Sequence, residues 1–390
     1  MHNKELRWGI VVSRYISWIN IFAVAYLAAP KVNIFDIPGF RQGLRLEDFL
    51  ILSVAASIIP FVRSLSINRF VAFLILFLVL NIFFGLWQPG SPTFKVAFFV
   101  RYLEYIVFYW IIFTYRSKLN VPFIFVSFVV IQLVPSLAQS LERRAYGTTA
   151  GPWELVSVVG VLGIYLLYTS ATSWRKISYL MIFFAFVVLT ESRISVLYVS
   201  LLLVAYAING RPSPLLATAF VVGLLAGGVV FLTNLEEDNR YASAFSIDNL
   251  NMVVNFAQQI GQQMEIDPYA ESGDLSLAVR LSIWANLVNT FSDGIFPFNY
   301  IFGVGLGANG VVVDGFYVRL IFETGAIGVL LFYYYSRKAL ASPEIRQVWV
   351  FLMVSCITLD PFTSSKISAA LIIVLVSKQQ NRIRCVLVKG

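Results

Sequence analysis

The residues of this chain that could carry out chemistry are arginines and carboxylates at the borders of apolar runs. The segment 274–328 contains the densest set: Arg280 lies in a polar stretch of helical periodicity, a glycine-rich run follows, and Asp314 precedes an apolar stretch. Ionisable groups at the mouth of an apolar helix, or inside it, are costly and commonly functional. We therefore take Arg280 and Asp314 as the first candidate catalytic residues.

Further arginines lie in the connections between apolar runs. A guanidinium group stays charged in a low dielectric and binds phosphate with two parallel hydrogen bonds. Several arginines that converge on one side of a membrane indicate a phosphate or diphosphate ligand, whereas any single one could be an ordinary loop charge beside anionic lipid. The members of this set are Arg41, Arg45, Arg143, Arg144, Arg193 and Arg280.

A very short connection at 190–195 contains one of these arginines. It joins two apolar runs with almost no loop, so it holds Arg193 at a fixed depth, which suits a residue that binds a ligand. Glu191 could orient Arg193 in that role. A local pair between Glu191 and Arg193 that only caps the helix ends is the alternative.

Arg280 has an aromatic neighbour, Trp284, one helical turn away on the same face. A cation beside an indole ring can hold a phosphate group and stack a sugar ring. The alternative is a packed Trp284 with Arg280 paired to Glu271 or Asp274.

The apolar run at 311–335 contains charged residues on two faces. Helical phase places Asp314 and Tyr317 on one face, and Arg319 and Glu323 nearly opposite. The i,i+4 spacing of the second pair predicts an ion pair that offsets an insertion cost of roughly 2.5–3.5 kcal/mol per charge. We interpret that pair as a structural brace, and Asp314 as the residue that transfers a proton.

The run at 95–115 contains a similar i,i+3 pair, Arg101 and Glu104, with Tyr105 near the same face. We count Arg101 among the substrate-binding candidates, together with Arg41, Arg45, Tyr317, Trp284 and Glu191. The glycines at 303, 305, 307 and 310 lack the strand–helix context of a nucleotide site, so they predict a backbone hinge or a simple linker.

The elements that must position these residues are membrane spans. The chain has 390 residues, of which 58% are hydrophobic and 13% charged, and its mean hydropathy is +0.78. Repeated apolar runs of about 20 residues predict an all-α polytopic membrane protein with about twelve transmembrane helices and no removable signal peptide. The expected spans are 9–29, 46–62, 70–87, 95–115, 121–140, 152–169, 175–190, 194–209, 214–232, 311–335, 346–360 and 364–378.

Lysine and arginine are denser in alternate, shorter connections, which predicts that both termini are cytoplasmic. The chain then divides into transmembrane helices at 1–232, an outer loop at 233–310, further spans at 311–378 and a basic cytoplasmic tail at 379–390. Within the loop, 246–265 predicts an amphipathic helix that caps the bundle or lies on the bilayer. Asp274 is a candidate N-cap of the next helix.

The composition also excludes some classes of function. The net charge of +8 follows the predicted membrane topology, so we expect no nucleic-acid partner. Two cysteines and one histidine leave almost nothing for a thiolate or imidazole metal site, although a carboxylate site stays open. We therefore expect no metal and no cofactor.

The order of these features resembles the superfamily of bacterial O-antigen polymerases and O-antigen ligases, which are integral-membrane glycosyltransferases. The resemblance covers the whole topology. Its sharpest motifs are Ser192-Arg193, Arg280-x-x-x-Trp284, the run Gly303-x-Gly305-x-Gly307 and Gly325-x-x-Gly328.

The resemblance implies a GT-C-like fold in the bacterial cytoplasmic (inner) membrane and substrates carried on undecaprenyl diphosphate. It implies that Arg193 and Arg280 hold the diphosphate, with membrane lipids and a chain-length regulator as candidate partners. Asp314 occupies the position where the ligases have a histidine, and this departure favours a polymerase of surface polysaccharide or lipopolysaccharide. A ligase, or a transporter (flippase) whose intramembrane pairs line a path, is the alternative.

Overall fold

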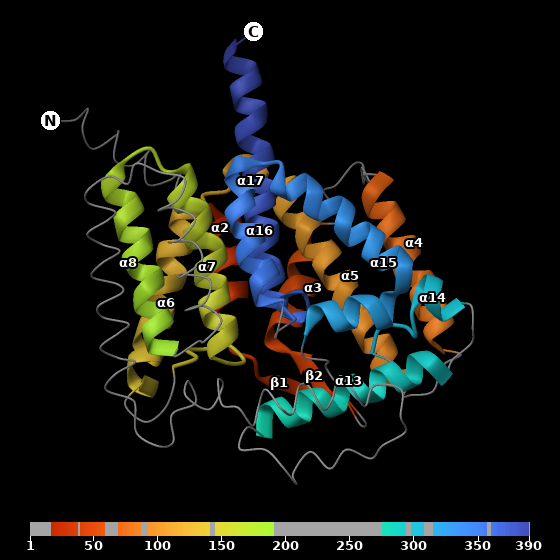
Figure 1. Cartoon of the computed structure of the whole chain (residues 1–390). Coiled ribbons are helices and arrows are strands. Elements are labelled where there is room, and N and C mark those ends of the chain that lie inside the picture. The colour runs from red at the N-terminus through yellow and green to blue at the C-terminus, as the bar shows by residue number, and fades with distance from the viewer. Residues whose placement is uncertain are drawn as a thin grey trace, which may run out of the picture.

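The computed structural model describes residues 17–37, 40–58, 69–86, 92–140, 145–190, 275–293, 298–307, 315–356 and 360–389. These residues form a bundle that is almost entirely helical (Figure 1). The predicted spans at 194–209 and 214–232 and the amphipathic helix at 246–265 lie outside the described residues, so the count of twelve spans stays a prediction.

The first half of the bundle contains the only strands among the described residues. The strands β1 and β2 pair in antiparallel order, with Asn33 opposite Arg45 and Ile37 opposite Phe40. The prediction of an all-α protein is therefore wrong at this hairpin, which falls in the first predicted outer loop. The elements are α2 (Trp18–Ala28), β1 (Asn33–Ile37), β2 (Phe40–Arg45), α3 (Leu46–Ile58), α4 (Arg69–Leu86), α5 (Pro92–Thr114) and the 3₁₀ turn η2 (Arg116–Lys118).

In the second half, α6 and α7 match the predicted ranges residue for residue, but α17 continues through the residues predicted as a separate tail. The elements are α6 (Val121–Ser140), α7 (Pro152–Thr169), α8 (Ser173–Thr190), α13 (Leu275–Asp293), α14 (Phe298–Phe302), α15 (Phe316–Leu340), α16 (Pro343–Ser355), the 3₁₀ turn η3 (Pro361–Thr363) and α17 (Ser365–Lys389).

Local chemistry explains where several elements begin. Pro152 and Pro343 occupy the first positions of α7 and α16, where a fixed φ suits a helix and a missing N–H costs nothing. At the start of α3, Asp48 reaches back so that its Oδ2 accepts the Arg45 N–H at 2.9 Å, which is half of a capping box. In η3, Asp360 Oδ1 accepts the Phe362 N–H at 3.1 Å.

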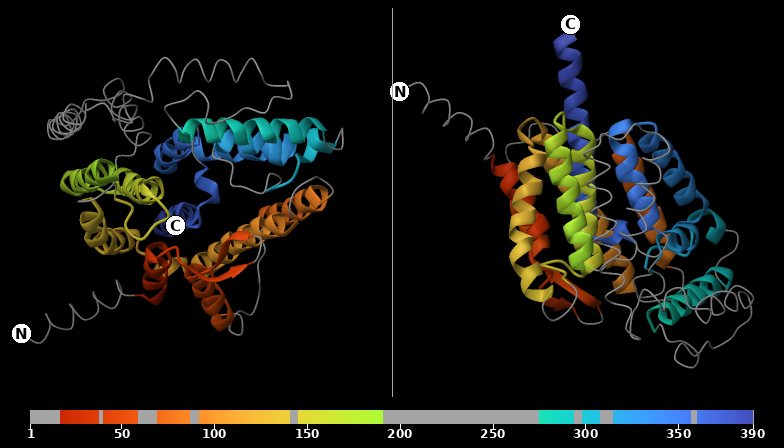
Figure 2. Two further views of the ribbon diagram at one scale, coloured as in Figure 1. Left: turned by 90° about the horizontal axis from the view of Figure 1, so that it is seen from below. Right: turned by 60° about the vertical axis from the view of Figure 1, so that its left-hand side comes forward.

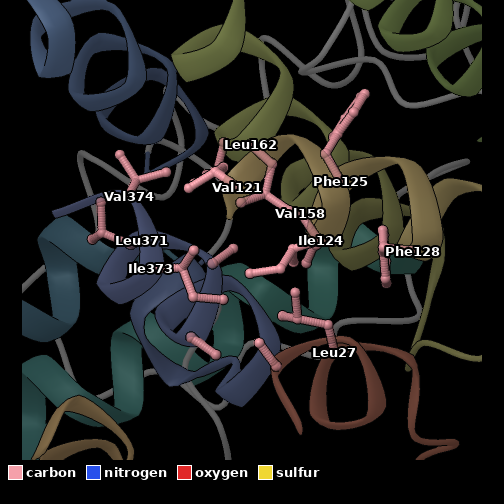
Figure 3. Packing of buried hydrophobic residues seen from close by; sticks show 14 of the residues in the cluster. Leu27, Val121, Ile124, Phe125, Phe128, Val158, Leu162, Leu371, Ile373 and Val374 are labelled. Carbon is pink, nitrogen blue, oxygen red and sulfur yellow. The ribbon is translucent and has the colours of Figure 1, made fainter. Parts of the chain in front are cut away.

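The apolar core lies where α2, α5, α6, α7, α16 and α17 pack together. Figure 3 shows Leu27, Ile124, Val158 and Ile373 turned toward one another from four helices. The first half of α17 is buried in this core, where van der Waals packing against the neighbouring helices stabilises it. The start of α17 is therefore fixed among helices from both halves of the chain.

Two ends of the bundle can be told apart. The hairpin end contains β1, β2, η3 and the first turns of α3, α5, α7 and α17, and α13 lies across it (Figures 1 and 2). The opposite end contains η2 and the α15–α16 connection. Gln380 Nε2 there donates to the Ser117 carbonyl at 3.1 Å, and Asn20 Nδ2 donates to the Lys118 carbonyl at 3.2 Å.

Four described helices are long and apolar enough to cross a membrane, in agreement with the prediction of a membrane protein. They are α6, α7, α8 and α15. Helix α6 exposes a run of large apolar side chains from Val126 to Leu137, and a contiguous apolar surface of this kind marks a contact with a membrane or another protein.

Candidate functional site

Helix α15 is broken just after its buried charged residues. Gly325 has φ +60° and ψ −163°, so the helical hydrogen bonds cannot continue through it. The carbonyls before the break find other donors: the Val304 N–H reaches Phe322 O at 2.9 Å and the Gly305 N–H reaches Glu323 O at 3.1 Å. Buried carbonyl groups need such partners. The break is thus stabilised by the glycine-rich run.

The glycines of this run make close backbone contacts. A Cβ at Gly303, whose φ is +75°, would lie 2.2 Å from the carbonyl carbon of Glu323. One at Gly305 would lie 2.4 Å from Gly85 Cα on α4. Asn81 Nδ2 on α4 donates to Glu323 O at 3.0 Å, and its Oδ1 accepts the Leu306 N–H. Residues 303–305 therefore pack as a fixed strap, so the prediction of a hinge or linker is wrong for these residues, while Gly310 lies outside the described residues.

The first buried charged group, which we call the Arg319 cluster, joins three elements. Arg319 Nε lies 2.8 Å from Glu323 Oε2, which confirms the expected i,i+4 pair. Arg319 also donates through Nη1 to the Asp360 carboxylate and through Nη2 to the Tyr102 hydroxyl, the latter at 2.6 Å. Arg319, Glu323 and Asp360 are each at most 3% exposed. This cluster couples α15, α5 and the start of η3.

The second group, the Arg101 cluster, lies where α5, α3 and the hairpin meet. Arg101 Nη1 lies 2.6 Å from Glu104 Oε2, as the i,i+3 spacing predicts, and 2.7 Å from Asp48 Oδ1. Glu47 Oε1 lies 3.7 Å from the same nitrogen. One guanidinium group therefore faces three carboxylates.

Neighbouring elements complete the Arg101 cluster. Glu47 is fully buried, and its Oε1 accepts hydrogen bonds from Ser365 Oγ at 2.6 Å and from Arg45 Nη1 at 3.4 Å. The Tyr26 hydroxyl donates to Glu104 Oε1 at 3.0 Å, and the Tyr105 hydroxyl donates to the Thr363 carbonyl at 2.8 Å.

The third group, the Glu154 cluster, lies at the start of α7. Glu154 is fully buried; it accepts from Lys31 Nζ at 2.5 Å, from the Ala150 N–H at 2.8 Å and from Ser364 Oγ. Lys366 is also fully buried, and its ammonium group donates to the carbonyls of Ala29 and Thr148. Charge-assisted hydrogen bonds of this kind are roughly twice as strong as neutral ones.

All three clusters meet at the segment 360–366, which the sequence reasoning missed. Asp360 contacts the Arg319 cluster, Ser365 contacts the Arg101 cluster and Ser364 contacts the Glu154 cluster. The segment reads D-P-F-T-S-S-K between two apolar runs. The polar composition of this segment at the boundary of two spans could have indicated a functional segment. No sequence pattern indicates which residues it pairs with, because Ser365 and Glu47 are 318 positions apart.

Other residues at the site that were not among the candidates are Glu47, Asp48 and Tyr102. Glu47 and Asp48 lie in the first turn of α3, where the helix dipole alone favours acidic residues, so their types did not indicate a site. Tyr102 lies beside Arg101 in the sequence, but it points to a different cluster.

Three of the predicted binding residues that the structure describes lie on α5, on the hairpin and on α15. Arg101 and Arg45 lie in the Arg101 cluster, facing carboxylates, so an anion would have to compete with these carboxylates for Arg101. Tyr317 lies in the first turn of α15, where its hydroxyl donates to the Met353 carbonyl at 2.9 Å. Their roles in binding a substrate stay predictions.

Arg280 and Trp284 lie on α13, which packs along α15. A Cβ at Gly315, whose φ is +99°, would lie 2.7 Å from Trp284 Cζ2, so the indole fills the space that this glycine leaves. Trp284 also packs against the cluster of Leu287 and Val304, as the first part of the alternative predicts, whereas Glu271 and Asp274 lie outside the described residues. Arg280 is half-buried one turn earlier on α13.

Four of the predicted site residues cannot be placed in this geometry. Asp314, Arg193 and Glu191 lie outside the described residues, as does the side chain of Arg41, whose backbone belongs to β2. Within the described ranges, no group of three or more histidine, cysteine or acidic side chains is arranged to hold a metal ion.

Comparison with known proteins does not identify the chain: no protein-family model matches it, and no curated protein matches its sequence.

Proposed function

We propose that this protein is a membrane glycosyltransferase that polymerises O-antigen or a related surface polysaccharide from repeat units linked to undecaprenyl diphosphate. The observation that carries the proposal is the contact between Trp284 on α13 and Gly315 at the start of α15. Arg280 lies one turn from Trp284, and Asp314 directly precedes Gly315 in the sequence. The contact supports the proposal because it joins the helix that carries Arg280 to the residue that follows Asp314 in the sequence, while Asp314 itself lies outside the described residues.

The reaction needs one bond made and one broken. A sugar hydroxyl of one lipid-linked unit attacks the anomeric carbon of the growing glycan, and the bond from that carbon to the diphosphate oxygen breaks. Undecaprenyl diphosphate leaves with the electron pair, so Arg193 and Arg280 stabilise its developing charge. Asp314 orients the acceptor hydroxyl and takes its proton, a contribution of typically 10²–10⁴-fold.

In this proposal the hairpin end faces the periplasm, and the buried clusters hold the site rigid. The Arg319 cluster fixes the start of α15, on which α13 packs, and the Arg101 cluster fixes the hairpin that carries Arg41 and Arg45. Because three carboxylates surround Arg101, this region favours sugar hydroxyl groups as donors over the diphosphate. Arg101 is accordingly a positioning residue in the proposed mechanism.

The test replaces Arg280 or Asp314 by Ala in the native host and measures polysaccharide length and the lipid-linked pool. We expect single repeat units on undecaprenyl diphosphate and no long glycan, while Arg346→Ala at the opposite end leaves the glycan unchanged. Normal-length glycan from both variants would refute these roles. Long chains stranded on undecaprenyl diphosphate would indicate a ligase instead.

A second candidate, a transporter of lipid-linked glycan, has one observation in its favour. Helix α15 is discontinuous at Gly325, next to the buried Arg319 and Glu323, and substrate or ion sites of many transporters lie at such breaks. Purified protein in liposomes separates the candidates. Elongation of lipid-linked units without any ion gradient supports the polymerase, whereas gradient-dependent translocation without elongation supports the transporter.

A further inference from the structure

The carboxyl groups of Asp48 and Glu104 lie close together in the Arg101 cluster. Both contact the same nitrogen, Arg101 Nη1, at 2.7 Å and 2.6 Å, so one guanidinium nitrogen holds the two carboxyl groups close to each other. Ionised carboxylates only accept hydrogen bonds, so neither group can donate to the other unless one of them carries a proton. Two like charges this close also disfavour double ionisation.

The surroundings decide which carboxyl group carries the proton. Asp48 lies in the first turn of α3, and its Oδ2 accepts the Arg45 N–H at 2.9 Å. A helix N-terminus and a backbone donor both stabilise the negative form. Glu104 lies within α5, away from a helix end, and its other donor is the Tyr26 hydroxyl. These surroundings favour Glu104 as the group that carries the proton.

The charges around the pair support the same conclusion. Two guanidinium groups, those of Arg45 and Arg101, contact the carboxyl groups of the cluster. These carboxyl groups belong to Glu47, Asp48 and Glu104, so carboxyl groups outnumber the cations. Glu47 is fully buried, and its Oε2 meets no hydrogen-bond donor among the residues that the structure describes. A further buried negative charge is costly, and one proton removes it. The remaining titratable groups nearby are Tyr26, Tyr105 and Lys366, and the Lys366 ammonium donates to backbone carbonyls.

We propose that Glu104 and Asp48 form a proton-binding site that holds one exchangeable proton at neutral pH. The proton comes from water at the hairpin end and converts the Glu104 carboxylate to a carboxylic acid, with no other bond changed. This site is separate from the proposed transfer chemistry of Arg280 and Asp314. It would exist whether the protein joins glycans or transports them.

Infrared spectroscopy of the purified full-length protein in lipid nanodiscs tests the site directly. The wild-type-minus-Glu104→Gln difference spectrum at neutral pH should contain the C=O band of a protonated carboxylic acid, and this band should shift in D₂O. Glutamine has the shape of protonated glutamate, and its amide N–H can donate to Asp48, so we expect the variant to fold. Glu344→Gln, which changes a carboxylate at the opposite end, should leave the band in place.

A second variant checks the partnership. In Asp48→Asn the acceptor carboxylate is gone, so Glu104 ionises against Arg101, and the protonated-carboxyl band should disappear as in Glu104→Gln. Carboxylate bands in the wild-type-minus-Glu104→Gln spectrum would overturn the proposal, because they would show that Glu104 is ionised. A band that survives Asp48→Asn would equally overturn it, because the proton would not depend on the pair.

Discussion

The hairpin end and the opposite end of the bundle use charge in contrasting ways. At the hairpin end the charged side chains are largely buried, and they join elements that are far apart in the sequence; they are Lys31, Arg45, Glu47, Asp48, Arg101, Glu104, Glu154, Arg319, Glu323, Asp360 and Lys366. At the opposite end most are exposed cations, and among the described residues a single carboxylate accompanies them. This second set is Arg116, Lys118, Arg175, Lys176, Arg337, Lys338, Arg346, Lys378 and Glu344.

The difference indicates what each set does. Exposed cations beside a membrane contribute little to folding, but they set the orientation of the spans. Trp174, which is 74% exposed beside Arg175, fits the aromatic belt of a membrane interface. Buried, mutually paired charges are costly to separate, so they fix the relative positions of α3, α5, α7, α15 and η3.

The largest expected effect comes from Arg319. Arg319→Ala leaves the Glu323 and Asp360 carboxylates buried without this guanidinium, and breaking a buried pair costs about 3–5 kcal/mol. We expect little folded protein, measured as monodisperse yield and thermal unfolding in detergent. The matched control, Arg346→Ala at the opposite end, should change stability by no more than about 0.5 kcal/mol. Equal losses of thermal stability in both variants would contradict the difference proposed between the two ends.

A somewhat smaller effect is expected at Gly303. Alanine there must adopt a positive φ, at about 1–2 kcal/mol, and its Cβ would collide with the backbone of Glu323, at about 1–3 kcal/mol more. Gly163→Ala on α7 is the control. Its Cβ would lie 3.4 Å from the Phe125 ring on α6, which is an ordinary van der Waals contact. Thermal unfolding should show a loss for the first variant and no loss for the second. A stable Gly303→Ala protein would mean that the strap is loose.

The next effect tests the segment that joins the clusters. Ser365→Ala removes the hydrogen bond to buried Glu47, and hydrogen bonds to charged groups contribute about 1.5–3 kcal/mol. Ser178→Ala, which removes an exposed hydroxyl bonded to the Trp174 carbonyl, should be nearly neutral. Denaturant titration in detergent gives the unfolding free energies of both variants. If Ser365→Ala lost as little stability as Ser178→Ala, segment 360–366 would not join the clusters.

The smallest stability effect is expected at the basic end. Arg175→Gln and Arg337→Gln should each change the unfolding free energy by less than about 0.5 kcal/mol, because both side chains are exposed. In the proposed orientation this end lies in the cytoplasm, and the combination should reduce the fraction of molecules inserted that way. Labelling of a cysteine introduced at 171 with a membrane-impermeant reagent in whole cells measures that fraction. Unchanged orientation with a large loss of stability would contradict the assignment.

The sequence predicted those parts of the fold that depend on local patterns. The ranges of α6 and α7 are bounded by polar residues and Gly151-Pro152, so the apolar runs end where the helices do. The pairs Arg101–Glu104 and Arg319–Glu323 were predictable because both partners lie on one helix. The hairpin was missed because its short strands lack a clear alternation of apolar and polar residues.

The rest of the site depends on contacts that no local pattern contains. Asp360 meets Arg319, and Ser364 meets Glu154, only after helices from both halves of the chain have packed. The prediction of one continuous helix at 311–335 also lacks the break at Gly325. A glycine inside an apolar run signals a break only when a neighbouring segment, here 303–305, supplies donors to the freed carbonyls.

The most direct test of the proposed function is elongation by the purified protein in lipid nanodiscs, with undecaprenyl-diphosphate-linked repeat units as the only substrates and no ion gradient. We expect wild-type protein and Arg346→Ala to form a ladder of longer lipid-linked glycans, and Arg280→Ala to remain folded but form none. A folded wild-type protein that forms no ladder, or an Arg280→Ala ladder equal to that of the wild type, would contradict a transfer site at the hairpin end.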